Sequence, residues 1–387
     1  MNLAELMKKS PLVRGAVIAP SVVALVFGLF NLTATPDPVA AMRAVTVGIV
    51  NQDEGMPTPA GARRLADPIV TGLTAQLPFK TETFTSADVA RAALDDGRIA
   101  AALVIPADFS RSVATNTPVR ATVMNSDHLS QTETQLGRTL PAQLQAGLSL
   151  AVVAARAQMQ QASAGITPVA NTVAPPAPAA PQPPVVVGTE TLHPAASAAT
   201  LAAPFVLSFA GWMAALVGSI LLFVGTRSQM KAAGVGMITA ARIAVPVVAA
   251  LSGGLMAALT YATVTGSWDS FVELWMYRWF VGAAVMATLT ALFSLFGFAA
   301  ILAAVPLVFY QGIASGILIP VAATPTWIAW TNDVLPLSEM TTGLRTILIG
   351  GPEGSVPWVQ TSALWIGATV MIAAGTTLYA KFAPAHR

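Results

Sequence analysis

The sequence predicts an all-α membrane protein of six transmembrane helices, with an extracytoplasmic α/β domain inserted between the first and second helix. Three observations lead to this prediction. Hydrophobic residues make up 55% of the 387 residues and charged residues only 10%, whereas soluble proteins carry about 25% charged residues. The apolar residues gather in long runs without charge. Between the first two runs, strand-like and helix-like segments alternate.

The charge-free runs give the number of membrane spans. A helix needs about 20 apolar residues to cross a bilayer. Residues 15–34 form the first such run, and the later ones are 194–226, 243–268, 279–332 and 354–380. The run 279–332 is long enough for two crossings, so the sum is six.

These runs divide the chain into four parts. Residues 1–14 predict a short cytoplasmic elbow helix, which lies in the membrane interface, and residues 15–34 the first transmembrane helix. Residues 35–193 form the extracytoplasmic α/β domain. Residues 194–387 form a five-helix transmembrane domain with a re-entrant segment near 325–351.

Charge predicts the orientation of these spans. The segments 1–14, 227–242 and 381–387 carry eight of the basic residues and a single acid, Glu5. The short loops on the other side are mostly acidic. Because basic loops remain in the cytoplasm, both termini are expected inside and residues 35–193 outside. An alternative is that residues 1–34 are a cleaved signal peptide, which also leaves the domain outside.

The outside domain shows alternating elements. Strands are expected at 44–51, 79–84, 99–105 and 119–125. Helices are expected at 60–76, 86–97 and 106–115, and a longer helical arm at 130–164, interrupted at Pro141. The Pro/Ala-rich residues 167–184 predict an extended linker.

Signals of catalysis or cofactor binding are weak throughout. The chain has no cysteine, no G-x-x-x-x-G-K loop and no block of basic residues. We expect no catalytic residues, no metal site, no cofactor bound by this chain and no nucleic-acid binding. Asp53 and Glu54 form an acidic turn that we interpret as solvated. His128 is interpreted as a surface residue and His193 as an interfacial one.

Four stretches together resemble the type 2 ABC (ABC-2) transporter permeases, in particular the phage-infection-protein (YhgE/Pip) branch. They are RAVTVGIVNQDEG, DDGRIAAALVIPADFS, LAAPFVLSFAGWMAAL and PTWIAWTNDVLPLSEMTTGLRTILIGG. They follow the family's order over most of the chain. The long coiled-coil ectodomain of Gram-positive members is missing, and the Pro-rich linker is not a feature of the family.

The resemblance implies an exporter in the bacterial cytoplasmic (inner) membrane. It implies a homodimer that moves a hydrophobic or amphiphilic substrate outward between its subunits, in contact with membrane lipids. A separate ATPase chain would bind ATP and dock on the loop 226–242, where Arg227, Lys231 and Arg242 offer positive charge. Positive-inside topology alone also explains these three residues.

The re-entrant segment and the fifth span supply candidate pathway residues. Polar groups at membrane depth are candidates for lining an exit, and these are Gln311, Asp333, Glu339 and Arg345. Gln311 also suits a hydrogen bond between helices. Gly312 and Gly316 form a G-x-x-x-G pattern that predicts close helix packing, either between subunits or within one.

A second interpretation involves no transport. Members of this branch also serve as phage receptors and as accessory proteins of secretion, in which the outer domain does the work and the spans anchor it. A membrane enzyme has no supporting group of residues.

Overall fold

The computed structural model describes residues 43–58, 61–164, 183–316, 320–332, 335–351 and 358–382. The predicted elbow helix and first span, residues 1–34, lie outside these, as does most of the linker 167–184. The described chain is mostly helical, and it divides between Pro194 and Ala195 into two compact units. Three described helical segments are long and apolar enough to cross a membrane: Ala198–Thr265, Phe271–Gly312 and Thr361–Lys381. The membrane-protein class is therefore supported, while the count of six spans stays a prediction.

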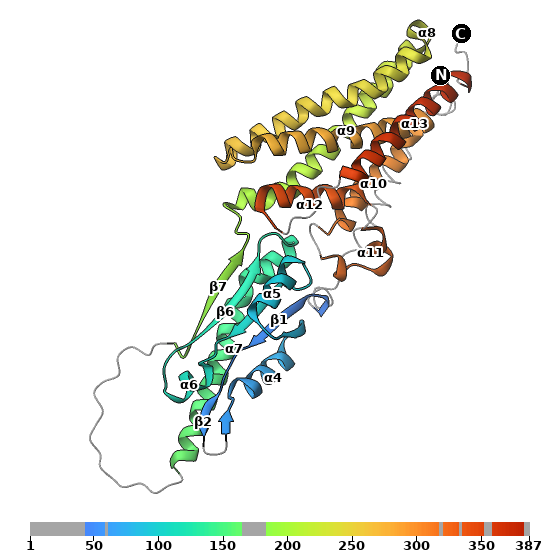
Figure 1. The fold of residues 1–387 in the computed structure, drawn as a ribbon. Coiled ribbons are helices and arrows are strands. Elements are labelled where there is room, and N and C mark those ends of the chain that lie inside the picture. Colours follow the sequence, from blue (N-terminus) through green and yellow to red (C-terminus); the bar gives the residue numbers. More distant parts are fainter. Residues whose placement is uncertain are drawn as a thin grey trace, which may run out of the picture. The chain divides into compact units, whose positions relative to one another are not determined.

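The unit that ends at Pro194 is built on a five-stranded sheet with the order β4-β1-β5-β6-β7 (Figure 1). Its strands are β1 (Thr46–Asn51), β4 (Lys80–Phe84), β5 (Ala101–Ile105), β6 (Val119–Ser126) and β7 (Val185–Leu192). β4, β1 and β5 are parallel, β6 runs antiparallel to β5, and β7 is parallel to β6. The four strands expected from the sequence are confirmed. β7 and the small hairpin of β2 (Met56–Thr58) and β3 (Gly61–Arg63) were not expected.

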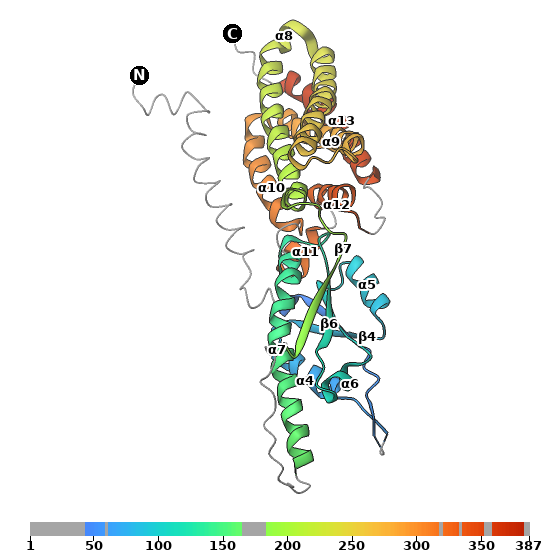
Figure 2. The same cartoon turned by 90° about the vertical axis from the view of Figure 1, so that its left-hand side faces the viewer.

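Helices cover both faces of this sheet, as Figure 2 shows for α5 and α7. Successive residues of a strand point to opposite faces, and β5 follows this rule. Leu103 and Ile105 pack in a core with α4 (Ala66–Gln76), α6 (Phe109–Ala114) and α7 (Gln131–Ala164). Ala102 packs on the other face with α5 (Ala87–Asp95). The result is a three-layer α/β sandwich.

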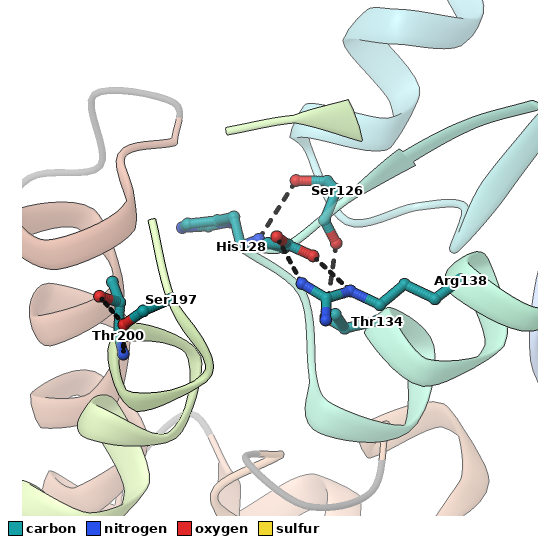
Figure 3. A network of polar contacts seen from close by, with 7 residues as sticks. Ser126, His128, Thr134, Arg138, Ser197 and Thr200 are labelled. Carbon is teal, nitrogen blue, oxygen red and sulfur yellow. Dashed lines mark hydrogen bonds and ion pairs between the residues drawn. The ribbon is translucent and has the colours of Figure 1, made fainter. Parts of the chain in front are cut away.

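The arm α7 begins at a polar turn after β6 (Figure 3). Ser130 and Glu133 form a capping box, in which each side chain accepts a hydrogen bond from the other residue's backbone N–H. The guanidinium of Arg138 donates to both carboxylate oxygens of Asp127, at 3.2 and 2.9 Å. The expected interruption of this helix at Pro141 is wrong, because α7 continues through that residue. The fully buried Leu140 and its neighbours pack against the sheet, which offsets the backbone hydrogen bond that proline cannot donate.

Asp53 is buried, only 2% exposed, which corrects its interpretation as a solvated turn residue. One carboxylate oxygen accepts hydrogen bonds from the backbone N–H groups of Gly55 and Ser110, at 3.1 and 2.9 Å. The other accepts from the N–H of Ala66, at 3.3 Å, and from the Ser110 hydroxyl. Since Ala66 and Ser110 lie in the first turns of α4 and α6, one charge satisfies the N-termini of two helices.

The second unit, from Ala195 onward, is helical. Its long elements are α8 (Ala198–Thr265), α9 (Phe271–Phe296) and α13 (Trp358–Phe382). Between them lie η1 (Gly297–Ala300), α10 (Ile301–Ala314), η2 (Val321–Ala323), α11 (Thr326–Asn332) and α12 (Pro336–Ile349). Gly234 has φ 76° and ψ 161°, outside the helical region, and divides α8 into two arms (Figure 2). Glycine adopts this backbone conformation without the strain that a side chain brings.

Glycines let these helices pack closely. A Cβ on Gly254 would lie 2.9 Å from the backbone nitrogen of Trp279, so α9 rests directly on the second arm of α8. A Cβ on Gly375 would lie 2.8 Å from the carbonyl carbon of Ser294, which places α13 against α9 (Figure 1). Small residues allow such backbone contact between apolar helices.

Candidate functional site

The turn at Gly234 stands at a basic end of the helical unit. Arg227 and Lys231 are exposed there. The Arg227 guanidinium lies 5.6 Å from the ring centre of Phe298 and 5.8 Å from that of Tyr379, so α13 ends at the same place with Lys381. These cation–π contacts orient Arg227.

Acids gather at the opposite end. Asp269 and Glu273 lie where the second arm of α8 passes into α9, and both are exposed. The exposed charges at the two ends of the described helical unit therefore differ in sign.

Arg242 is fully buried, unlike Arg227 and Lys231. Its Nε donates to the Thr226 hydroxyl at 3.0 Å, and its Nη1 donates to the hydroxyls of Ser294 and Thr376, both at 3.2 Å. The guanidinium also lies 5.3 Å from the ring centre of Phe223. Arg242 thus joins both arms of α8 to α9 and α13, and it is not available at the surface for a docking partner.

The hydroxyls around Arg242 predict a measurable contribution to stability. The double variant Ser294→Ala/Thr376→Val removes both acceptors of Nη1 and is expected to cost about 1.5–3 kcal/mol, because hydrogen bonds to charged groups are strong. Thermal unfolding in detergent measures this effect. Thr377→Val, next to Thr376 but exposed, is the control.

A double-mutant cycle separates this effect from simple packing. In an Arg242→Met background the same double variant is expected to change stability little, because the guanidinium that needs the hydroxyls is gone. An equal loss in both backgrounds contradicts the assignment.

The segment α10 to α12 holds the predicted pathway residues. Gln311 is 1% exposed, and its Oε1 accepts a hydrogen bond from the backbone N–H of Leu337 at 3.1 Å. Gln311 therefore caps the first turn of α12 from α10. Arg345 lies half-buried in α12. Asp333 and the Glu339 side chain lie outside the described structure.

The two glycines of the G-x-x-x-G pattern have different surroundings. A Cβ on Gly312 would meet no described atom within 4 Å, so this position faces open space in the single chain. Gly316 has φ 69°, and a Cβ there would lie 2.8 Å from the Val321 side chain. Gly316 thus serves a turn within the chain, and packing between subunits at Gly312 stays a prediction.

The α/β unit carries an apolar groove of about 830 Å³ between α4 and α7. Its walls include Ile69 and Leu73 from α4 and Ala151 and Ala155 from α7, and Arg63 also lines it. Its size suits a small ligand.

The two histidines of this unit approach each other. Their ring centres are 6.3 Å apart, and the His193 Nε2 lies 3.1 Å from a carboxylate oxygen of Asp95. Within the described residues, no cluster of three or more His, Asp or Glu side chains has the arrangement of a metal site.

Sequence reasoning missed two buried charged residues, Asp53 and Arg278. The sequence predicts a solvated Asp53 and no role for Arg278. The structure instead places Arg278 inside α9 with 6% of its surface exposed. No sequence signal distinguishes these two residues from exposed ones, because their burial depends on contacts with distant segments.

Most of this chain matches one known protein family. Residues 15–377 match the family described as ABC-2 family transporter protein. Neither the curated proteins nor the solved structures gave a match. Proteins of this family form the membrane part of ABC transporters and work with an ATPase, while the permease domain is not itself the nucleotide-binding ATPase. This chain belongs to the ABC-2 family of transporter proteins.

Proposed function

We propose that this chain is the membrane subunit of an ABC-2 exporter of the YhgE/Pip branch, and that it works as a homodimer. It moves a hydrophobic or amphiphilic substrate outward, and a separate ATPase chain supplies the energy of ATP hydrolysis. The charge-poor helical unit suits such a substrate. The mechanism is alternating exposure of a path between the two subunits.

The observation that carries this proposal is the exposed basic turn at Gly234. Family membership implies an ATPase partner. This turn presents Arg227 and Lys231 together with Met237, which is 64% exposed. A turn between two long helices offers a surface on which a partner can act. Movement applied there is transmitted along both arms of α8.

Charge supports the orientation. The Gly234 end carries Arg227, Lys231 and Lys381, and the other end carries Asp269 and Glu273. By the positive-inside rule the Gly234 end is cytoplasmic. The proposal keeps the six spans predicted from the charge-free runs, with residues 35–193 inserted outside after a first span at 15–34. The chain then lies in the bacterial cytoplasmic membrane with both termini inside.

Charge reversal at the turn tests the docking surface. The variant Lys231→Glu/Met237→Asp is expected to lower the amount of co-purifying ATPase at least about tenfold, since it places acids where acidic partner residues bind. The measurement is affinity purification in detergent with an assay of ATP hydrolysis. Lys381→Glu, an exposed charge reversal at the same end but on α13, is the matched control.

This design avoids the buried ends of the loop. Replacing all of residues 226–242 would remove Thr226 and Arg242, which are bound to each other inside the unit. If no ATPase accompanies the unaltered protein, or if the Lys231 and Lys381 variants behave alike, docking at this turn is contradicted.

The groove of the α/β unit favours a second function, that of a receptor or secretion-accessory protein anchored by its helices. In that case the groove between α4 and α7 binds the ligand and no ATPase is needed. An intact protein without any ATPase in the purification supports this alternative.

A further inference from the structure

Arg278 has no counter-charge in the described structure. It lies in the second turn of α9, and its Nε and Nη1 are buried without a hydrogen-bond partner among the described residues. The nearest acids along the chain, Glu273 and Asp269, are exposed and form no ion pair with it. Burying an unpaired guanidinium raises the free energy of the folded protein. A bound anion beside Arg278 would offset this cost.

A cavity of about 420 Å³ lies beside this guanidinium, between the two arms of α8 and α9. Arg278 is the only charged residue among the described residues that line it. The other lining residues are almost all apolar, and many are glycine or alanine: Ala210, Gly211, Ala214, Ala250, Gly253 and Gly282.

Gly211 shows why the residues here are small. A Cβ at that position would lie 2.0 Å from the Nη2 of Arg278, so the guanidinium rests directly on the helix backbone. Gly253, in contrast, has no described atom within 4 Å of a would-be Cβ and borders open space. Val206 and Met256, more than half exposed, form the rim.

We propose that this cavity binds a single-chain or lipid-like amphiphile through one anionic head group, a carboxylate or a phosphate. Arg278 donates hydrogen bonds from its planar fork to two oxygens of the head group. The apolar walls hold the first carbons of the chain, and the tail leaves over Val206 and Met256 toward the lipid. This inference rests on the proposed function and narrows its cargo to anionic amphiphiles.

Binding of dodecyl phosphate to the full-length protein in a neutral detergent tests the site, with titration calorimetry as the readout. Arg278→Gln is expected to weaken binding at least about tenfold, because it removes charge-assisted hydrogen bonds. Arg278→Lys keeps the charge but loses the planar fork, so its affinity for dodecyl phosphate should lie between those of the unaltered protein and Arg278→Gln. Equal affinity in the unaltered protein and in Arg278→Gln overturns the proposal.

A cavity variant guards against misfolding of the Arg278 variants. Gly253→Leu fills the cavity and is expected to weaken binding to a similar extent. Gly225→Leu adds the same side chain to the same helix, also into open space, but outside the cavity, and should bind normally. Equal affinity in these two leucine variants contradicts the location of the site.

Inorganic phosphate and dodecanol separate the contributions of head and tail. Neither is expected to displace dodecyl phosphate at matched concentration. Displacement by inorganic phosphate alone identifies a free-anion site, and displacement by dodecanol alone a non-specific apolar one; either result overturns the proposal.

The same protein preparations test the head-group site and the proposed function independently. The ATPase should co-purify with Arg278→Gln as with the unaltered protein, since the Gly234 turn is unchanged. An ATPase that is present, together with unaltered binding in Arg278→Gln, refutes only the head-group site. An absent ATPase, together with Arg278-dependent binding, refutes only the pump.

Discussion

Replacing Asp53 by alanine is expected to lower the free energy of unfolding of the α/β unit by about 3 kcal/mol or more. The carboxylate accepts four hydrogen bonds, from Gly55, Ala66 and twice from Ser110. Its loss leaves buried N–H groups of two helices without an acceptor. Hydrogen exchange of the β1 and β5 amides in the full-length protein measures the change.

Glu54 provides the matched control for this prediction. It is the next residue and also an acid, but its side chain is exposed. Glu54→Ala should leave amide protection within about 0.5 kcal/mol of the original. Asp53→Asn should lie between the two, since it keeps one oxygen acceptor. Similar protection in the two alanine variants contradicts the assigned role.

Gly375→Leu is expected to prevent normal assembly of the helical unit. Its side chain would enter the backbone of α9 at Ser294 and Leu295, at 2.8–2.9 Å from the Cβ alone. Overpacking usually costs about 1–3 kcal/mol, and here the obstacle is backbone that cannot rotate away. Displacing α13 from its place also breaks the hydrogen bond from Arg242 of α8 to Thr376.

Gly367→Leu is the control on the same helix, two turns earlier. A Cβ there meets no described atom within 4 Å, so the leucine should be tolerated. Size-exclusion profiles and melting temperatures in detergent compare the two. If the Gly375→Leu protein is monodisperse and has the same melting temperature as the Gly367→Leu variant, α13 does not pack on α9 in this way.

The elements of the α/β unit were predictable because their signals are local. Short strand-like runs bounded by turns predicted β1, β4, β5 and β6, and the Ser-to-Gly segment 86–97 predicted α5, whose Ser86 side chain accepts a hydrogen bond from the N–H of Val89. β7 was missed. It pairs with β6 across more than 60 residues of chain, from Val119 with Val185 to Ser126 with Leu192, and no local pattern records such a pairing.

The candidate sites divide in the same way. Arg227, Lys231 and Arg242 look alike in sequence, as basic residues between two apolar runs. The break at Gly234 brings the second arm of α8 back along the first, and this leaves Lys231 exposed while Arg242 lies against Thr226, Ser294 and Thr376. Gln311, in contrast, was a candidate pathway residue that also suited a hydrogen bond between helices, and in the structure it caps α12 from α10.

The sequence by itself determined that this is a membrane protein of the ABC-2 family, carrying a strand-and-helix segment after its first apolar run, because hydropathy, charge and short motifs are properties of consecutive residues. Only the tertiary structure decided which charges are buried. Asp53 differs from Glu54, and Arg278 from Glu273, through the helices that pack on them. Burial is a property of contacts between distant segments, so a single line of residues does not carry it.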